Sequence, residues 1–138
     1  MRRSPVVILD GAHNPDAARA LRETVEELWP SQRRHLLIGM SADKDLAGVC
    51  RIVAPLASWV VCTKSPHPRA AELIDVVEAV RAAQPNVTVV TDPRDALTYV
   101  LNTAREDDVI IVTGSLFVVG ALRSFATDVV AGGAGCPS

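Results

Sequence analysis

The sequence predicts an α/β fold: a three-layer, Rossmann-like domain whose mostly parallel sheet of about five strands carries helices on both faces. Short runs rich in valine and isoleucine, typical of strands buried in a parallel sheet, alternate with stretches whose apolar residues recur every three or four positions. The connections are short, as in strand–helix units joined by right-handed crossovers. With 138 residues the chain is too short for a (β/α)8 barrel, which needs about 250.

The first strand–helix unit covers residues 6–29. Val6–Leu9 is an apolar run that we interpret as a strand buried on both faces. Asn14 and Pro15 form a typical helix start, because asparagine caps free N–H groups and proline needs none at the first helical position. The helix should end near Trp29. Its predicted buried face consists of Ala18, Leu21, Val25 and Leu28.

Three more units follow in the middle of the chain. Their strands are predicted at residues 35–39, 58–63 and 87–91. We expect Ser41 or Asp43 to cap the helix after the first of these strands, and Asp92 with Pro93 to begin the helix after the third. The predicted inward residues of the three helices are Leu46, Val49, Cys50 and Val53, then Leu73, Ile74, Val77 and Val80, then Ala96, Leu97, Val100, Leu101 and Ala104.

The last unit begins with the apolar strand Val109–Thr113. Gly114 and Ser115 then open a final helix. Its predicted packing residues are Leu116, Val119, Leu122 and Phe125. Because no linker or internal repeat interrupts the pattern, we expect one domain over residues 1–130 and a flexible, glycine-rich tail over 131–138.

Composition excludes several classes of protein. The net charge of −2 gives no reason to expect nucleic acid or an anionic membrane as a partner. No apolar stretch approaches the roughly 20 residues that span a bilayer. The three cysteines are far apart and odd in number, which favours neither a disulfide framework nor a zinc site. A cytoplasmic protein without a metal site of its own is expected.

Asp10 and His13 are the first candidates for chemistry. In a parallel α/β sheet, ligands bind beyond the carboxyl ends of the strands, and these two residues flank a glycine turn between a strand and a helix N-terminus, where phosphate binds readily. Asp10 could accept a hydrogen bond from a ribose hydroxyl or a metal-bound water, and His13 could donate to a phosphate oxygen. The structural alternative is that Asp10 only caps nearby N–H groups and His13 is an exposed loop residue.

Three further loops carry weaker candidates. Lys44 could place a cation near a nucleotide, or belong to a solvated helix cap. Arg69 could hold a carboxylate or phosphate as a fork, or lie on the surface without a ligand. Gly114 and Ser115 could present N–H groups and a hydroxyl to an anion, or simply cap a helix. The sequence contains neither a G-x-x-x-x-G-K-[ST] P-loop nor a G-x-G-x-x-G motif, so a complete phosphate-activating site is absent.

Four stretches together resemble a known family. Residues 10–15 read D-G-A-H-N-P, residues 38–45 contain G-x-x-x-D-K-D, residues 68–70 read P-R-A, and residues 112–120 contain T-G-S-L-F-x-x-G. In this combination and order they resemble the C-terminal domain of folylpolyglutamate synthase/dihydrofolate synthase, within the Mur ligase superfamily. The resemblance extends over residues 5–125.

The resemblance implies an ADP-forming ligase that joins L-glutamate to the carboxylate of a folate or of dihydropteroate. In this family ATP phosphorylates the carboxylate, and the amine of glutamate attacks the acyl phosphate. The P-loop, the magnesium ligands and most of the folate pocket belong to the N-terminal domain. The resemblance further implies that Asp10, His13 and Asn14 contact ATP. Lys44, Arg69, Gly114 and Ser115 would be further contacts to ATP or glutamate, and no catalytic residue or metal ligand is expected in this chain.

Because the P-loop domain is missing, we expect no ligase activity from this chain alone, whether it is an excised domain or a natural split product. Its expected partner is that N-terminal P-loop domain. One alternative is a free-standing module that binds a nucleotide or an amino acid for regulation. Another is a structural remnant that docks on a partner protein.

Overall fold

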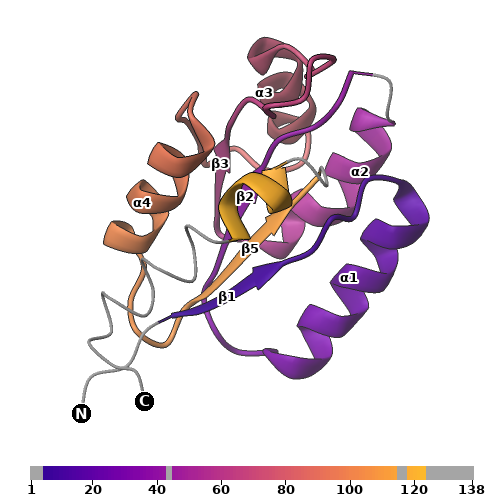
Figure 1. The fold of residues 1–138 in the computed structure, drawn as a ribbon. Coiled ribbons are helices and arrows are strands. Elements are labelled where there is room, and N and C mark those ends of the chain that lie inside the picture. Colours follow the sequence, from indigo (N-terminus) through magenta and orange to yellow (C-terminus); the bar gives the residue numbers. More distant parts are fainter. Residues whose placement is uncertain (1–4, 43–44, 115–117, 124–138) are drawn as a thin grey trace.

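A computed structural model describes residues 5–42, 45–114 and 118–123, and the fold is built from these. They form one five-stranded, all-parallel sheet with helices on both faces, which confirms the predicted fold class (Figure 1). The strands are β1 (Val6–Leu9), β2 (Arg34–Ile38), β3 (Trp59–Cys62), β4 (Val87–Val89) and β5 (Val109–Thr113). The helices are α1 (Pro15–Leu28), α2 (Leu46–Val53), the short 3-10 helix η1 (Ala54–Leu56), α3 (Leu73–Arg81), α4 (Pro93–Thr103) and residues 118–123.

The strand order is β1-β5-β2-β3-β4, which the sequence left open. Helices α1, α2 and α3 pack on one face of the sheet, while α4 and residues 118–123 pack on the other. The chain therefore moves outward from β1 to β4 with its helices on the first face. It then returns through α4 on the second face to insert β5 between β1 and β2. This reversal of face is what uniformly right-handed crossovers require.

Successive side chains of each strand point to opposite faces of the sheet, and this divides the core into two halves. In β2, Leu36 and Ile38 pack against the α1–α3 layer, whereas Leu37 faces the α4 layer. In β5, Ile111 packs against the α1–α3 layer and Ile110 faces the α4 layer. The burial of these strands follows from having helices on both faces of the sheet.

The prediction that the first strand is buried on both faces is wrong. β1 is an edge strand, paired only with β5, and Val6 is 42% exposed. The position in the sheet decides burial here, because the local sequence of an edge strand and that of a central strand can be equally apolar. β5, which lies between β1 and β2, is buried along its whole length.

Helix starts agree with the sequence at two places and differ at one. Asn14 caps α1, its side-chain oxygen accepting the Ala17 N–H at 2.8 Å, and Asp92 caps α4. The N-cap of α2 is Asp45, which accepts the Gly48 N–H, so the prediction of Ser41 or Asp43 is wrong.

The inward faces of the helices are largely as predicted, with two errors. Leu28, in the last turn of α1, is 57% exposed, and Ile74, in the first turn of α3, is 64% exposed. Both lie at helix ends, where the apolar period continues beyond the layer against which the helix packs. The predicted tail, residues 131–138, lies outside the described residues. Within the part of the chain that is described, no helix is long and apolar enough to cross a membrane.

Candidate functional site

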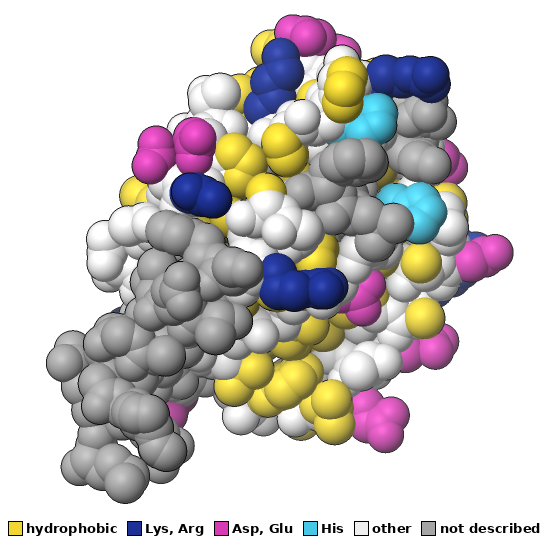
Figure 2. Space-filling view, viewed as in Figure 1, with side chains coloured by type: hydrophobic (Ala, Val, Ile, Leu, Met, Phe, Trp, Pro, Cys, Tyr) yellow, Lys and Arg dark blue, Asp and Glu magenta, His cyan; other side chains and the backbone are white. Residues whose placement is uncertain are grey.

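The candidate site lies at the edge of the sheet where the strands end. The neighbouring strands β1 and β5 lead to helices on opposite faces, since α1 packs on the first face and residues 118–123 pack on the second. Such a divergence creates the crevice in which open α/β sheets bind ligands. In the space-filling view, histidine side chains are exposed on this side of the molecule (Figure 2).

Backbone hydrogen bonds join the loop after β1 to the end of β5. The Asp10 N–H donates to the Val112 carbonyl at 2.9 Å, and the Gly114 N–H donates to the Ala12 carbonyl at 3.0 Å. The Thr113 hydroxyl donates to the same Ala12 carbonyl at 3.3 Å. Residues 10–14 are therefore held directly beside Gly114, as the sequence predicted for loops at one sheet edge.

Gly114 is required by the geometry of this junction. Its φ is +102°, a conformation that side-chain-bearing residues rarely adopt. A Cβ at this position would lie 2.6 Å from the Gly39 carbonyl oxygen, so the two loops approach each other as bare backbone. Because the Gly114 N–H already binds Ala12, that group is not available to an anion. Any ligand contact of Gly114 must use other atoms.

Asp10 uses one of its two carboxylate oxygens to stabilise the turn after β1. Its Oδ1 accepts the Ala12 N–H at 2.9 Å, which fixes the turn. Among the residues that the structure describes, the other carboxylate oxygen makes no hydrogen bond, and the side chain is partly exposed. The capping interpretation and the ligand-binding interpretation are thus compatible, because each uses a different oxygen.

His13 and Asn14 also divide their polar atoms between the fold and the solvent. His13 Nδ1 lies 2.8 Å from the Gly11 carbonyl oxygen, which orients the ring and leaves Nε2 outside this bond. Asn14 uses its oxygen to cap α1, so its amide N–H groups remain for a ligand. All three predicted nucleotide contacts thus come from one loop at the N-terminus of the 14-residue helix α1.

Arg69 lies at the same edge of the sheet, where a second set of backbone hydrogen bonds joins two loops. The Ala42 N–H donates to the Arg69 carbonyl at 2.7 Å, and the Ala71 N–H donates to the Met40 carbonyl at 2.9 Å. These bonds bind the loop after β3 to the loop after β2, and the latter contacts β5 through Gly39. Lys44 and Ser115, the two other predicted contacts, lie outside the described residues.

Neither a metal centre nor a reactive thiol is present in the described ranges 5–42, 45–114 and 118–123. No group of three or more histidine, cysteine, aspartate or glutamate side chains there could hold a metal ion. Cys50 and Cys62 are buried, and burial raises the pKa of each thiol to about 12, so both are protonated at neutral pH.

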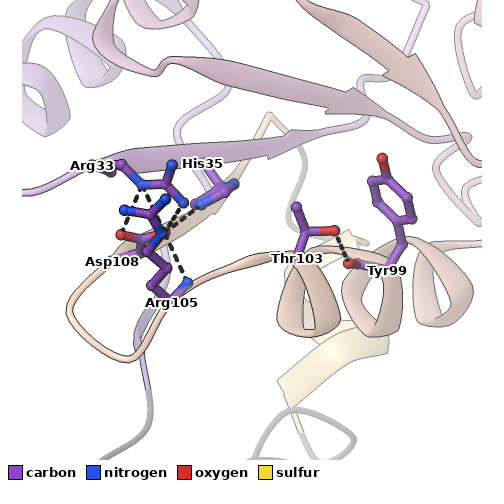
Figure 3. A network of polar contacts seen from close by, with 6 residues as sticks. All are labelled: Arg33, His35, Tyr99, Thr103, Arg105 and Asp108. Atoms are coloured by element: carbon purple, nitrogen blue, oxygen red, sulfur yellow. Dashed lines mark hydrogen bonds and ion pairs between the residues drawn. The ribbon is translucent and has the colours of Figure 1, made fainter.

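Sequence reasoning missed a charged network at the opposite edge of the sheet (Figure 3). The buried carboxylate of Asp108 accepts hydrogen bonds from Arg33 at 2.8 Å and from the Arg105 N–H at 2.9 Å, and His35 Nε2 lies 2.8 Å away. His35 also stacks on Trp59, with the ring centroids 5.2 Å apart. No local pattern could reveal the side-chain partners of Asp108, because Arg33 and His35 are more than 70 positions away from it in the sequence.

Asp108 is held as a carboxylate. Burial alone would raise its pKa, but the hydrogen bonds from Arg33, the Arg105 N–H and His35 outweigh burial and hold the pKa well below its usual range. An open hollow of about 500 Å³ lies beside the network. Since the Arg33 guanidinium and the Asp108 carboxylate already bind each other, we interpret the network as structural.

Comparison with known proteins gives a family match over most of the chain. Residues 1–116 match the model described as "Mur ligase, glutamate ligase domain". The chain is 37% identical over 126 residues to a probable bifunctional folylpolyglutamate synthase/dihydropteroate synthase of Halobacterium salinarum, and the match covers 90% of this chain. It covers only 15% of that relative.

Solved structures agree with the family match. An Escherichia coli FolC structure in complex with DHPP and ADP superposes with a TM-score of 0.82 at 27% identity, covering 93% of this chain and 30% of that one. A Yersinia pestis bifunctional folylpolyglutamate synthase/dihydrofolate synthase complexed with AMPPNP and a manganese ion gives a TM-score of 0.74 at 28% identity, covering 87% and 28%. The chain therefore spans under a third of each protein it matches here.

Proposed function

The chain belongs to the Mur ligase glutamate ligase domain family, and from this premise we propose that it is the C-terminal domain of an ATP-dependent ligase. The reaction joins L-glutamate to the carboxylate of a folate or of dihydropteroate. ATP phosphorylates that carboxylate, the glutamate amine attacks the acyl carbon, and the bond to phosphate breaks. The observation that supports this most is the loop of residues 10–14, fixed at the crevice of a domain whose solved relatives hold ADP or AMPPNP.

In this proposal the polar atoms of residues 10–14 that the fold leaves unused have roles in binding. The second carboxylate oxygen of Asp10 accepts hydrogen bonds from the ribose hydroxyls. His13 Nε2 and the Asn14 amide approach the phosphates, which the N-terminus of α1 attracts through its partial positive charge. Arg69 binds a carboxylate of glutamate or a phosphate, and Lys44, Gly114 and Ser115 complete the cleft.

The remaining parts of the site come from an N-terminal P-loop domain. Because the described residues form no cluster that could hold a metal ion, we assign magnesium to that domain. The present domain then positions the nucleotide, closes over the acyl phosphate and excludes water. We place the protein in the cytoplasm, in keeping with the unpaired thiols of Cys50 and Cys62.

Turnover tests the need for the second domain. This chain, mixed with Mg-ATP, L-glutamate and dihydropteroate or a folate, is expected to release no ADP above the blank. Addition of a P-loop domain from a family member, free or fused, should give ADP release that depends on glutamate. The P-loop domain alone is the control. ADP release by this chain in isolation would contradict the proposal. ADP binding without turnover in any pairing would favour a free-standing binding module.

Asp10→Asn tests the nucleotide contact separately from the fold. Asparagine keeps an oxygen that can accept the Ala12 N–H, so thermal stability should change little. ADP affinity should fall about tenfold, because a hydrogen bond to a charged acceptor contributes about 1.5 kcal/mol or more. Titration calorimetry measures both proteins, and Glu23→Gln, which removes an exposed carboxylate of α1, is the matched control. Equal affinity of Asp10→Asn and wild type would exclude Asp10 from the site.

A further inference from the structure

We propose that nucleotide binding to this domain is coupled to the uptake of one proton by His13. The inference rests on the proposed function and deepens it. In the neutral tautomer that the structure selects, the hydrogen of the His13 ring lies on Nδ1. The ring becomes a cation when Nε2 binds a phosphate oxygen.

The bond between His13 and Gly11 decides where the hydrogen of the neutral ring lies. Nδ1 is 2.8 Å from the Gly11 carbonyl oxygen. A carbonyl oxygen can only accept a hydrogen bond, so Nδ1 must be the donor. Nε2 of the neutral ring then carries a lone pair. A phosphate oxygen is also an acceptor, so it can bind Nε2 only after Nε2 has gained a proton.

The surroundings of His13 favour the cation only together with an anion. The ring lies just before the N-cap Asn14, and the partial positive charge at the start of α1 opposes a further positive charge there. Asp10 is the acidic group of the same loop, and Asp16, in the first turn of α1, pairs with Arg19. Residues 113–114 bond to this loop, and residues 39–42 bond to residues 113–114. Neither segment contains a charged residue. A bound phosphate would supply the missing negative charge.

His67, in the loop that carries Arg69, provides an internal comparison. Its Nδ1 accepts the Arg69 N–H at 2.8 Å, because a backbone N–H can only donate. The neutral ring of His67 therefore has its hydrogen on Nε2. The two histidines of this edge thus have opposite tautomers, and nitrogen NMR distinguishes them.

Long-range ¹⁵N–¹H NMR of the histidine rings at pH 8, during titration of the full chain with ADP, tests the coupling. Before addition, His13 should give the pattern of an Nδ1–H tautomer and His67 that of an Nε2–H tautomer. At saturation His13 should show both nitrogens protonated. Titration calorimetry in two buffers of different ionisation enthalpy should report the uptake of about one proton at pH 8.

Affinity gives the second measurement. ADP should bind more tightly at pH 6 than at pH 8, because Nε2 of His13 must carry a proton before it can bind a phosphate oxygen. His13→Gln should lose this pH dependence, and the variant corrects for protonation of ADP itself. If ADP binds while His13 stays neutral, the coupling is wrong and the proposed function stands. If no ADP binds to wild type at any pH, both are wrong.

Discussion

Replacing Gly114 with alanine is expected to lower the free energy of unfolding by about 3 kcal/mol. The residue has a φ of +102°, and an added Cβ would lie 2.6 Å from the Gly39 carbonyl oxygen. Relief of this clash would separate the loop after β5 from the loop after β2 and would disturb the Gly114–Ala12 hydrogen bond. ADP affinity should fall together with stability. Urea denaturation measures the first effect and calorimetry the second.

Gly120 offers a matched control for this substitution. It lies in the helix of residues 118–123, and a Cβ there would have no atom of the described residues within 4 Å. Gly120→Ala should therefore leave stability unchanged or raise it by up to about 1 kcal/mol, since alanine favours helix more than glycine does. Equal effects of the two substitutions would refute the tight junction at Gly114.

Replacing Asp108 with alanine is expected to cost about 3 to 5 kcal/mol of folding stability. The carboxylate is buried and binds Arg33, and it also accepts the Arg105 N–H. Its removal leaves the charge of Arg33 and the ring of His35 without this partner. Urea denaturation of Asp108→Ala and of the exposed-site control Glu23→Gln measures the difference. A loss below about 1 kcal/mol would show that the network contributes little.

The same carboxylate predicts the acid response of the protein. Its pKa is depressed in the folded state, so its contribution is complete above the ordinary aspartate pKa of about 3.9 and is lost as the pH falls below that value. Wild type should therefore lose stability between pH 4 and pH 2 more steeply than Asp108→Ala. Identical pH profiles of the two proteins in that range would contradict the assignment.

Local chemistry in the sequence was enough for the parts of the fold that depend on neighbours along the chain. Asn14 and Asp92 cap helices as predicted, because a cap binds N–H groups only two or three residues away. The site was predictable for a similar reason, since the polar residues that follow parallel strands must share one edge. The structure confirms that Asp10, His13 and Asn14 lie on one loop. Their binding of a nucleotide stays a prediction.

Features that depend on distant parts of the chain were not predictable. The exposure of Val6 follows from the place of β1 at the end of the strand order, which no local pattern predicts. The side-chain partners of Asp108, Arg33 and His35, lie at the start of β2, and the acidic turn containing Asp108 reads as an ordinary surface loop. The engagement of the Gly114 N–H by Ala12 likewise required the two loops to be seen together.

The most direct test of the account is a two-dimensional ¹⁵N–¹H NMR titration of the chain with ADP. We expect the changes to be confined to the amides of the loop at residues 10–14, the first turn of α1 and the joined residues 39–42 and Gly114. That result would locate the nucleotide at the crevice between β1 and β5. No change at millimolar ADP, or changes only around Arg33 and Asp108 at the opposite edge, would contradict the proposal that this domain holds part of the ATP site.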